Sequence, residues 1–261
     1  MPELPEVEAY RRLADKALGR TVASVRIGDQ RFLRGGTDAC RLRRALVGKA
    51  FAAARRRGKL LVLDVDDSDR RLGLRFGMTG RLHVDGADGV DRLVYASDRR
   101  LEAWDRFALR FTDGGSLVVS DPRLLGGVVL DPDEDVLGPD ALDVGRADLH
   151  RALAGSTAAL KARLMDQSRL AGLGNLVADE VLWRAGLSPL RPAGSLTDAE
   201  ERRLHGHVRR TLEELVSAGG SHLGELMPER QVGGRCPRCG AELRRDRVGG
   251  RSTWWCPAHQ R

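Results

Sequence analysis

Two unlike halves of the chain meet at Asp131-Pro132-Asp133-Glu134-Asp135-Val136-Leu137-Gly138-Pro139-Asp140. This stretch is acidic and contains two prolines, a composition typical of a linker between domains. Before it, from Thr21 to about Leu130, short apolar alternations are separated by Gly and Asp turns, a pattern typical of β-strands. After it, apolar residues recur at the helical period. The sequence therefore predicts an α+β protein in which a β-sandwich or flattened barrel precedes a group of helices.

These patterns predict four segments. A β-sandwich domain is expected over residues 1–131, a linker over 132–145, a helical domain over 146–229 and a separate terminal segment over 230–261. The sandwich should open with a helix from Glu3 to about Leu18, followed by a second near Thr37 to Leu46. In the helical domain we predict helices from Asp148 to Ala154, Ala158 to Asp166, Asn175 to Ala185 and Thr197 to Ala218.

Charge along the chain points to an anionic partner. The chain has 261 residues and a formal net charge of +7, and its isoelectric point is near 9.8. Residues 230–261 contain eight Arg and only two acidic residues, which gives this tail a net charge of +6. Nucleic acid is the partner that such a basic segment favours.

The sequence contains no apolar run long enough to span a membrane, and its acidic start lacks the features of a signal peptide. We therefore expect a cytoplasmic protein without a membrane partner. Three of the four cysteines lie in the basic tail, so a disulfide framework is not expected. The remaining one, Cys40, is expected to be a small buried side chain.

The basic tail carries paired metal ligands. Cys236-Pro237-Arg238-Cys239 is followed, after sixteen residues, by Cys256-Pro257-Ala258-His259. Two ligand pairs of this spacing can hold one tetrahedral zinc ion between two turns. Because four protein ligands leave no coordination position for water, we predict that Cys236, Cys239, Cys256 and His259 bind one structural zinc ion.

The chain opens with Met1-Pro2-Glu3-Leu4-Pro5-Glu6-Val7-Glu8. Methionine aminopeptidases remove an initiator Met that precedes a side chain as small as Pro. The mature protein would then begin with the secondary amine of Pro2, a nitrogen nucleophile with the carboxylate of Glu3 beside it. The same residues are also favoured at the start of any helix, so a purely structural interpretation remains open.

A second cluster lies in the run from Leu164 to Glu180. Its glycines allow a tight turn, and Asn175 is predicted to cap the helix that follows. The N–H groups at such a helix start can bind phosphate. An ordinary turn between two packed helices is the alternative.

Five spaced motifs occur in order along the chain. They are Met1 to Glu8, Arg56-Arg57-Gly58-Lys59, Phe76-Gly77-Met78-Thr79-Gly80, Asp121-Pro122-Arg123 and the run Asp166 to Glu180. Together with the terminal knuckles, they resemble the motifs of formamidopyrimidine-DNA glycosylases, a family that includes endonuclease VIII, over essentially the whole chain. The opening sequence is closer to formamidopyrimidine-DNA glycosylase than to endonuclease VIII. The resemblance implies a helix-two-turn-helix in the helical domain, a zinc finger at residues 230–261 and a catalytic sandwich domain.

The resemblance assigns catalytic roles to residues of the first domain. Pro2 resembles the family's Schiff-base nucleophile, which attacks C1′ of the damaged nucleotide. Glu3 resembles the acid and base that protonates the sugar oxygen, and Glu6 matches a further acidic position of the site. Lys59 matches a lysine that contacts the phosphate next to the lesion.

The resemblance also assigns DNA contacts. Asn175 and Arg251 match phosphate-binding residues of the helical turn and the zinc hairpin. Met78 and Arg123 match side chains that fill the gap left by the flipped nucleotide, and Leu125 stands where the family usually has an aromatic. Arg75 replaces a common histidine and keeps a cation. Ordinary core packing remains the alternative for Met78 and Leu125.

The implied activity is that of a bifunctional glycosylase and AP lyase, which excises an oxidised or ring-opened base and cleaves the strand by β,δ-elimination. Its partner would be double-stranded DNA with a damaged base or abasic site, and the protein would act as a monomer on the bacterial nucleoid. Two alternatives are a non-catalytic damaged-DNA-binding protein and a member specialised for bulky adducts. Because the segment from Ser221 to Arg235 is short, we expect 8-oxoguanine to be a poorer substrate than ring-opened or oxidised pyrimidine lesions.

Overall fold

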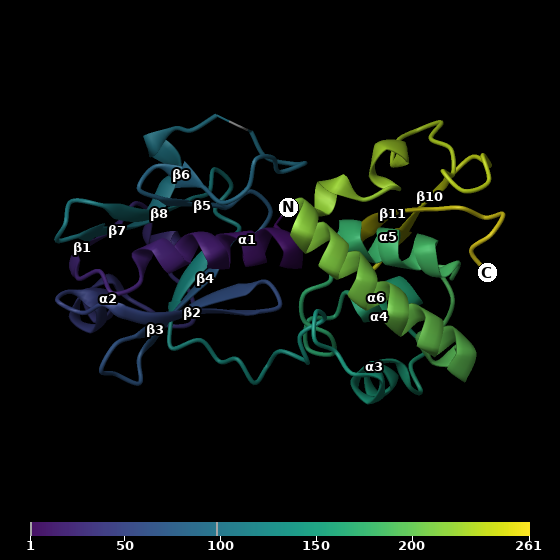
Figure 1. Cartoon of the computed structure of the whole chain (residues 1–261), viewed down its shortest axis with the longest axis horizontal. Helices are drawn as coiled ribbons and strands as arrows, with labels where there is room; N and C mark the ends of the chain where they lie inside the picture. Colours follow the sequence, from purple (N-terminus) through teal and green to yellow (C-terminus); the bar gives the residue numbers. More distant parts are fainter. Residues whose placement is uncertain (1, 98) are drawn as a thin grey trace. The chain divides into compact units, whose positions relative to one another are not determined.

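The computed structural model describes residues 2–97 and 99–261. The chain forms two compact units, Met1–Glu134 and Asp135–Arg261, and their boundary falls inside the acidic stretch (Figure 1). The first unit is built mainly from antiparallel sheets, and the second mainly from helices. The predicted α+β class, with sheets before helices, is confirmed.

Two antiparallel sheets form the first unit and share one apolar core, which makes it a β-sandwich. One sheet has the order β1-β7-β8-β5-β6: β1 (Val22–Ile27), β7 (Asp105–Phe111), β8 (Ser116–Ser120), β5 (Arg81–Val84) and β6 (Ala87–Asp88). The other has the order β2-β3-β4-β9: β2 (Phe51–Arg57), β3 (Leu60–Val65), β4 (Arg71–Arg75) and β9 (Gly127–Leu130).

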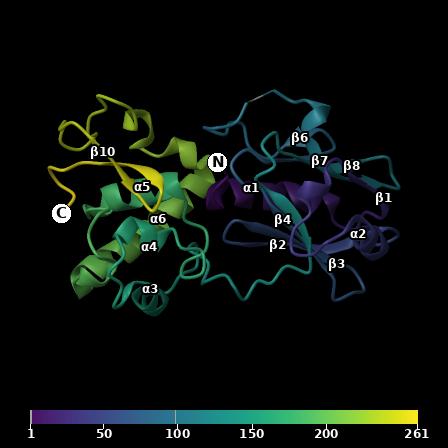
Figure 2. The ribbon, with the colours of Figure 1, turned by 180° about the vertical axis from the view of Figure 1, so that it is seen from behind.

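Helix α1 (Leu4–Ala14) lies between the two sheets, and both views show it there (Figures 1 and 2). Val7 and Tyr10 are fully buried in the core shared by the sheets. The Tyr10 hydroxyl donates to the Gly80 carbonyl at 3.1 Å, so α1 is bonded to the loop between β4 and β5. A 3-10 turn, η1 (Asp15–Ala17), continues the helix almost to the predicted end at Leu18.

Helix α2 (Ala39–Leu46) confirms the second helix predicted in the sandwich, but the prediction for Cys40 is wrong. Leu42 and Leu46, four residues apart, point into the core and are fully buried. Cys40 lies on the other side of the helix and is exposed. Its residue type favoured burial, but its position relative to the apolar stripe decided the outcome.

The acidic stretch is bonded to each unit at its two ends. Asp131 accepts a hydrogen bond from the backbone N–H of Arg71 at 3.0 Å, and Glu134 forms an ion pair with Arg55 at 3.0 Å. Further along, the N–H of Gly138 donates to a carbonyl of the second unit at 2.9 Å. These two carboxylates therefore anchor the start of the acidic stretch to the β-sandwich. A purely flexible linker would lack such contacts.

The second unit contains four α-helices in its described residues and one β-hairpin. Helix α5 has the predicted bounds, whereas α4 ends two residues before the predicted Asp166. The elements are α3 (Arg146–Leu153), α4 (Leu160–Leu164), α5 (Asn175–Ala185), α6 (Asp198–Ala218), β10 (Arg244–Val248) and β11 (Arg251–Trp255). Short 3-10 turns in the two units are η2 (Gln30–Phe32), η3 (Glu102–Trp104), η4 (Ala193–Ser195), η5 (Ser221–Leu223) and η6 (Met227–Glu229).

Helix α6 begins with a capping box. Thr197 accepts a hydrogen bond from the N–H of Glu200 at 3.3 Å, and the Glu200 carboxylate accepts from the N–H of Thr197 at 2.8 Å. The helix ends at Gly219, whose φ of +103° is unfavourable for residues with a Cβ. Of the helices in the described residues, none has the length and apolar character that crossing a membrane requires.

Candidate functional site

The opening residues form the start of α1. Glu3 is its N-cap residue, and the backbone N–H of Glu3 donates to Glu6 Oε2 at 2.8 Å. The Glu3 carboxylate in turn accepts the backbone N–H of Glu6, which completes a capping box. Pro2, Glu3 and Glu6 are all buried. The structural interpretation of these residues as a helix start is correct, and it keeps a carboxylate immediately next to Pro2 in the chain.

Lys59 lies in the tight turn between β2 and β3, directly after Gly58, which has a φ of +57°. This hairpin is joined to α1 by an ion pair between Arg56 Nε and Glu8 Oε2, 3.1 Å apart. Arg56 and Glu8 are largely buried, and Glu8 is about one and a half helical turns from Glu3. The hairpin that carries Lys59 is therefore bonded to the same helix that begins beside Pro2.

Met78, Arg123 and Leu125 come together on two touching loops of the first unit, and we call these three side chains the loop cluster. Arg123 Nη1 lies 3.8 Å from Met78 Sδ. A Cβ on Gly77 would lie only 2.5 Å from the Leu125 carbonyl carbon, so the two loops are in direct contact. Leu125 is 47% exposed, which excludes core packing as its role. Arg75, exposed at the end of β4, directly precedes the first loop.

In the second unit, the predicted capping role of Asn175 is wrong. The N-cap residue of α5 is Gly174, and Asn175 is the first residue of the helix. Its side-chain oxygen instead accepts a hydrogen bond from Lys161 Nζ at 2.7 Å. Asn175 is buried to 8% exposure, so this contact fixes its side chain. A buried cation from a neighbouring helix thus replaced the local capping interaction.

Lys161 is the centre of a buried network that the sequence did not reveal. Its ammonium forms an ion pair with Asp179 at 2.7 Å and donates to Thr253 Oγ1 at 2.8 Å. Asp179 also pairs with Arg230 at 2.7 Å. Lys161 and Asp179 have fully buried side chains. The only signal in the sequence is that charged residues occupy apolar faces of predicted helices.

This network connects α5 to the hairpin of β10 and β11. Thr253 belongs to β11, which begins with the exposed residue Arg251. The tight turn before it consists of Gly249 and Gly250, both at positive φ. One ammonium, that of Lys161, therefore contacts both the Asn175 side chain and the strand that carries Arg251.

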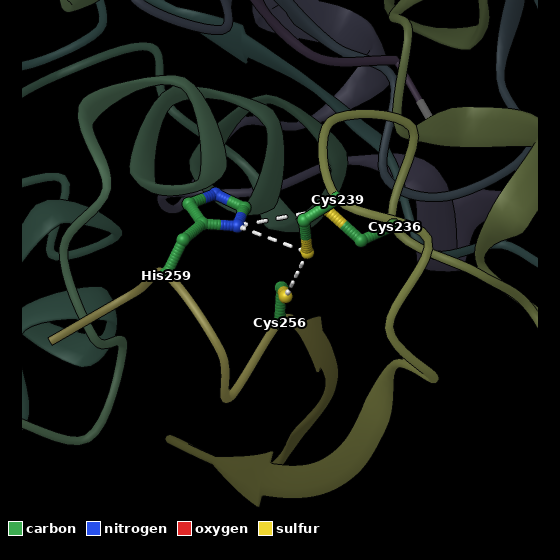
Figure 3. Close-up of side chains that lie close together, drawn as sticks. All are labelled: Cys236, Cys239, Cys256 and His259. Carbon is green, nitrogen blue, oxygen red and sulfur yellow. Dashed lines mark hydrogen bonds between the residues drawn. The ribbon is translucent and has the colours of Figure 1, made fainter.

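The four predicted zinc ligands lie together, with their ligand atoms within 4.8 Å of one another. Figure 3 shows their side chains converging from the two turns. Cys239 Sγ is 3.4 Å from Cys256 Sγ, and His259 Nδ1 is 3.5 Å from Cys236 Sγ and 3.9 Å from Cys239 Sγ. A tetrahedral zinc ion with Zn–S bonds of about 2.3 Å separates its ligands by about 3.8 Å. The Cys3His group therefore fits one zinc ion.

Neighbouring residues orient these ligands. His259 Nε2 lies 3.2 Å from the Trp183 carbonyl, so it carries the proton and leaves the Nδ1 lone pair toward the sulfurs. Burial lowers the pKa of His259, the hydrogen bond to the Trp183 carbonyl opposes this, and Arg238 adds to the lowering, so the net shift favours the neutral imidazole. The Trp183 indole N–H donates to Cys236 Sγ at 3.3 Å. Zinc is bound by neutral imidazole and by thiolate sulfur, and the indole N–H stabilises the thiolate form of Cys236.

Comparison with protein families matches nearly the whole chain. Residues 1–128 match the formamidopyrimidine-DNA glycosylase N-terminal domain. Residues 137–225 match the formamidopyrimidine-DNA glycosylase H2TH domain, and residues 233–258 match the zinc finger found in FPG and IleRS. The three matches follow the order sandwich, helices, zinc hairpin.

Similar proteins are matched over their full length. Formamidopyrimidine-DNA glycosylases of Heliobacterium modesticaldum and Halorhodospira halophila are each 38% identical, with all of both chains covered. Among solved structures, the Lactococcus lactis protein Fpg (MutM) with N7-benzyl-Fapy-dG DNA is 29% identical, with a TM-score of 0.84 and all of both chains covered. A complex of Lactococcus lactis Fpg with abasic-site DNA is 28% identical, with the same TM-score and coverage.

Proposed function

Because the chain belongs to the formamidopyrimidine-DNA glycosylase family, we propose that it repairs DNA with the amine of Pro2 as its nucleophile. The chain is a DNA repair glycosylase with AP lyase activity, the bifunctional chemistry general to this family. One observation carries this conclusion: relatives of that activity match all of this chain with all of their own length. Its partner is DNA that contains a damaged base or an abasic site.

In the proposed reaction, removal of Met1 exposes the secondary amine of Pro2. An α-amine has a pKa near 8, so roughly a tenth of it is unprotonated at pH 7. The amine attacks C1′, the glycosidic bond breaks, and its electron pair leaves with the base. Glu3 protonates the sugar ring oxygen as the ring opens, and loss of the amine proton gives the Schiff base. β- and then δ-elimination release the 3′ and 5′ phosphates.

We propose that Lys59, Asn175 and Arg251 bind the phosphates around the flipped nucleotide, and that Arg75 adds a further cation. A flipped nucleotide requires its flanking phosphates to be held by positive or N–H donors. The half-buried position of Lys59 in a tight turn and the exposure of Arg251 at a hairpin tip support these roles. Glu6 supports the site from within the capping box of α1.

We propose that the loop cluster, Met78, Arg123 and Leu125, fills the gap left in the duplex. Arg123 contacts the half-buried Met78, and both Arg123 and Leu125 are exposed, which supports this role. Apolar side chains that enter base steps unstack and bend DNA. The zinc ion takes no part in the chemistry, because its four ligands fill the tetrahedral shell, and it stabilises the hairpin that carries Arg251.

For the substrate, we propose ring-opened and oxidised pyrimidine lesions and abasic sites, with 8-oxoguanine poorer. The short segment from Ser221 to Arg235 supports a base site with few capping contacts, and bulky adducts remain a second candidate. The solved relative with N7-benzyl-Fapy-dG DNA favours testing that class.

We also propose a monomer that acts on the bacterial nucleoid, with domains at 1–131, 146–229 and 230–261 and a linker at 132–145.

Borohydride trapping on an abasic oligonucleotide tests the nucleophile, because reduction converts a Schiff base into a stable covalent adduct. Wild type should form the adduct, and Pro2→Gly should lose most of it. Pro5→Ala is a matched control, since Pro5 lies in the first turn of the same helix without being N-terminal. Equal trapping by protein with a blocked N-terminus would overturn the proposal. DNA binding without any adduct would favour the non-catalytic alternative.

A further inference from the structure

We propose that Asp121 is a positioning residue that holds the loop cluster in its working arrangement before DNA binds. The cluster consists of three side chains on two separate loops, so its arrangement must be fixed by contacts between the loops. This inference rests on the proposed role of the cluster in filling the duplex gap. It concerns a residue that does not itself reach DNA, because Asp121 is fully buried.

One carboxylate bonds both loops. Asp121 Oδ1 accepts from the Thr79 hydroxyl at 2.5 Å and from the backbone N–H of Arg123 at 3.1 Å. Asp121 Oδ2 accepts from the backbone N–H of Gly126 at 2.8 Å. Thr79 directly follows Met78, and Gly126 directly follows Leu125. The three donors therefore lie at, or next to, each member of the loop cluster.

The start of the second loop has its own support. Arg106 Nε donates to the Asp121 carbonyl at 2.7 Å, and Nη2 donates to the Pro122 carbonyl at 3.4 Å. The same guanidinium donates to the Ala103 carbonyl at 3.1 Å. A buried polar group is costly unless it is hydrogen-bonded, and the three donors to Asp121 satisfy both of its carboxylate oxygens. Backbone and side chain of this one residue are thus both fixed.

The second loop also adopts a conformation that needs support. Leu124 has a φ of +54°, a left-handed conformation that a leucine rarely adopts. Its carbonyl accepts from Arg34 Nη2 at 3.1 Å. Strained backbone persists only where surrounding contacts over-determine it, and it is concentrated at functional sites. The bonds of Asp121 on both sides of Leu124 supply these contacts.

This arrangement predicts a dependence on DNA structure. A loop cluster that is fixed in advance spares the ordering of its side chains when it enters the duplex. An abasic site in single-stranded DNA has no opposite base and no stack to fill. Loss of the Asp121 contacts should therefore slow the reaction on duplex DNA while leaving the reaction on single-stranded DNA nearly unchanged.

Asp121→Asn tests this because it keeps the size of the side chain but turns one acceptor oxygen into a donor NH₂ group. Single-turnover strand cleavage should be measured on one abasic sequence as duplex and as single strand. We expect the duplex rate to fall roughly tenfold and the single-strand rate less than about twofold. 2-Aminopurine opposite the site should report slower insertion of the loop cluster. Asp113→Asn is the control, since Asp113 accepts the Gly115 N–H in another turn of the unit.

Thr79→Val removes only one of the three hydrogen bonds and should lower the duplex-to-single-strand ratio in the same direction by a smaller factor. This variant keeps the test decisive if Asp121→Asn does not fold. An unchanged ratio in a folded variant, or an equal fall of both rates, would overturn the inference. Failure of the proposed function looks different, because wild type itself would then form no borohydride adduct on either DNA.

Discussion

The two units hold the segments that we propose to contact DNA by different means. In the first unit, the loop cluster stands on a sandwich whose two sheets and central helix share one apolar core. Its loops are joined by the buried carboxylate of Asp121, and the guanidinium groups of Arg106 and Arg34 bond the second loop. In the second unit, the hairpin with Arg251 rests on a small apolar cluster and depends on a zinc site and a buried charge network. That small cluster contains Trp183, Leu226, Cys236, Leu243, Trp254 and Cys256.

The difference follows from how much apolar surface each segment can bury. Burial stabilises by about 25 cal/mol per Å² of apolar surface, so a two-stranded hairpin with few core residues gains little from it. A metal site or a buried ion network then has to supply the missing stabilisation. We therefore expect the two units to respond differently to loss of zinc, loss of buried charge, change of an exposed side chain and change of pH.

The largest effect should come from the zinc site. Structural zinc sites contribute about 10 kcal/mol or more of apparent binding free energy to folding. Chelation of zinc, or Cys256→Ser, should unfold the hairpin. DNA binding should then weaken by more than about tenfold, because the hairpin no longer holds Arg251, the proposed phosphate contact, in position. Hydrogen exchange should rise in β10 and β11 while the sandwich stays protected. Cys40→Ser is the control, since this exposed cysteine lies outside the site. Unchanged DNA affinity in zinc-free protein would contradict the comparison.

The buried network should come next. Lys161→Met removes an ammonium and leaves the Asp179 carboxylate with Arg230 as its charged partner. Removing one member of a buried pair costs about 3–5 kcal/mol, and we expect the lower end because Arg230 remains. Thermal unfolding measures this cost. The salt dependence of DNA binding should also become shallower, because β11, which carries the proposed phosphate contact Arg251, loses its bond to the Lys161 ammonium.

The matched control for this variant is Lys16→Met, which changes an exposed lysine of the first unit. A double variant with Asp179→Asn separates charge from packing. If the buried pair matters as proposed, the double variant should be more stable than the sum of the single changes predicts. Additive losses would show that the two charges act independently.

The sequence predicted the local features of both units well. Helix α5 has the predicted bounds, because the glycines before Asn175 and Gly186 after Ala185 break the helical period at both ends. The zinc ligands were found because their spacing lies within a short segment. Such signals depend only on residues that are near one another in the chain.

Long-range contacts account for what the sequence missed. Asn175 was predicted to cap its own helix, but its side-chain oxygen instead accepts a hydrogen bond from Lys161, which lies in another helix. The role of Asp121 depends on Thr79, which lies forty-two positions away. Cys40 was predicted to be buried from its residue type, although its helix turns it to solvent. The outcomes at Asn175 and Asp121 have no periodic or motif signal in the sequence, whereas at Cys40 the apolar stripe of Leu42 and Leu46 carried a signal that the residue type did not.

A moderate effect is expected at the exposed tip of the loop cluster. Leu125→Phe introduces the aromatic that the family resemblance implies at this position, and base–aromatic stacking contributes about 1–3 kcal/mol per base. We expect tighter binding to abasic duplex DNA, by about fivefold if part of that stacking is gained. Leu190→Phe is the control, because Leu190 is also exposed, at 44%, but lies in the second unit and outside the segment from Ser221 to Arg235. Equal gains in both variants would indicate a nonspecific hydrophobic effect.

The smallest effect should come from the exposed cap of α6 and should depend on pH. The Arg191 side chain, with help from the Thr197 backbone, lowers the pKa of Glu200 to about 2. Because the folded pKa lies below the unfolded value of about 4.3, this stabilisation is complete above that value and disappears as pH falls toward 2. Solvent screens this partly exposed ion pair, so its contribution is at most about 1 kcal/mol.

Glu200→Gln should therefore lower the melting temperature slightly at pH 7 and less at pH 3.5. Both proteins lose zinc as cysteines are protonated, so only the difference between them at each pH is informative. Glu213→Gln, which breaks the exposed pair with Arg209 in the same helix, is the control for the loss of one surface carboxylate. If Glu200→Gln proved as costly as Lys161→Met, the second unit would depend on its surface ion pairs as much as on its buried network, and the contrast between the two units would have to be redrawn.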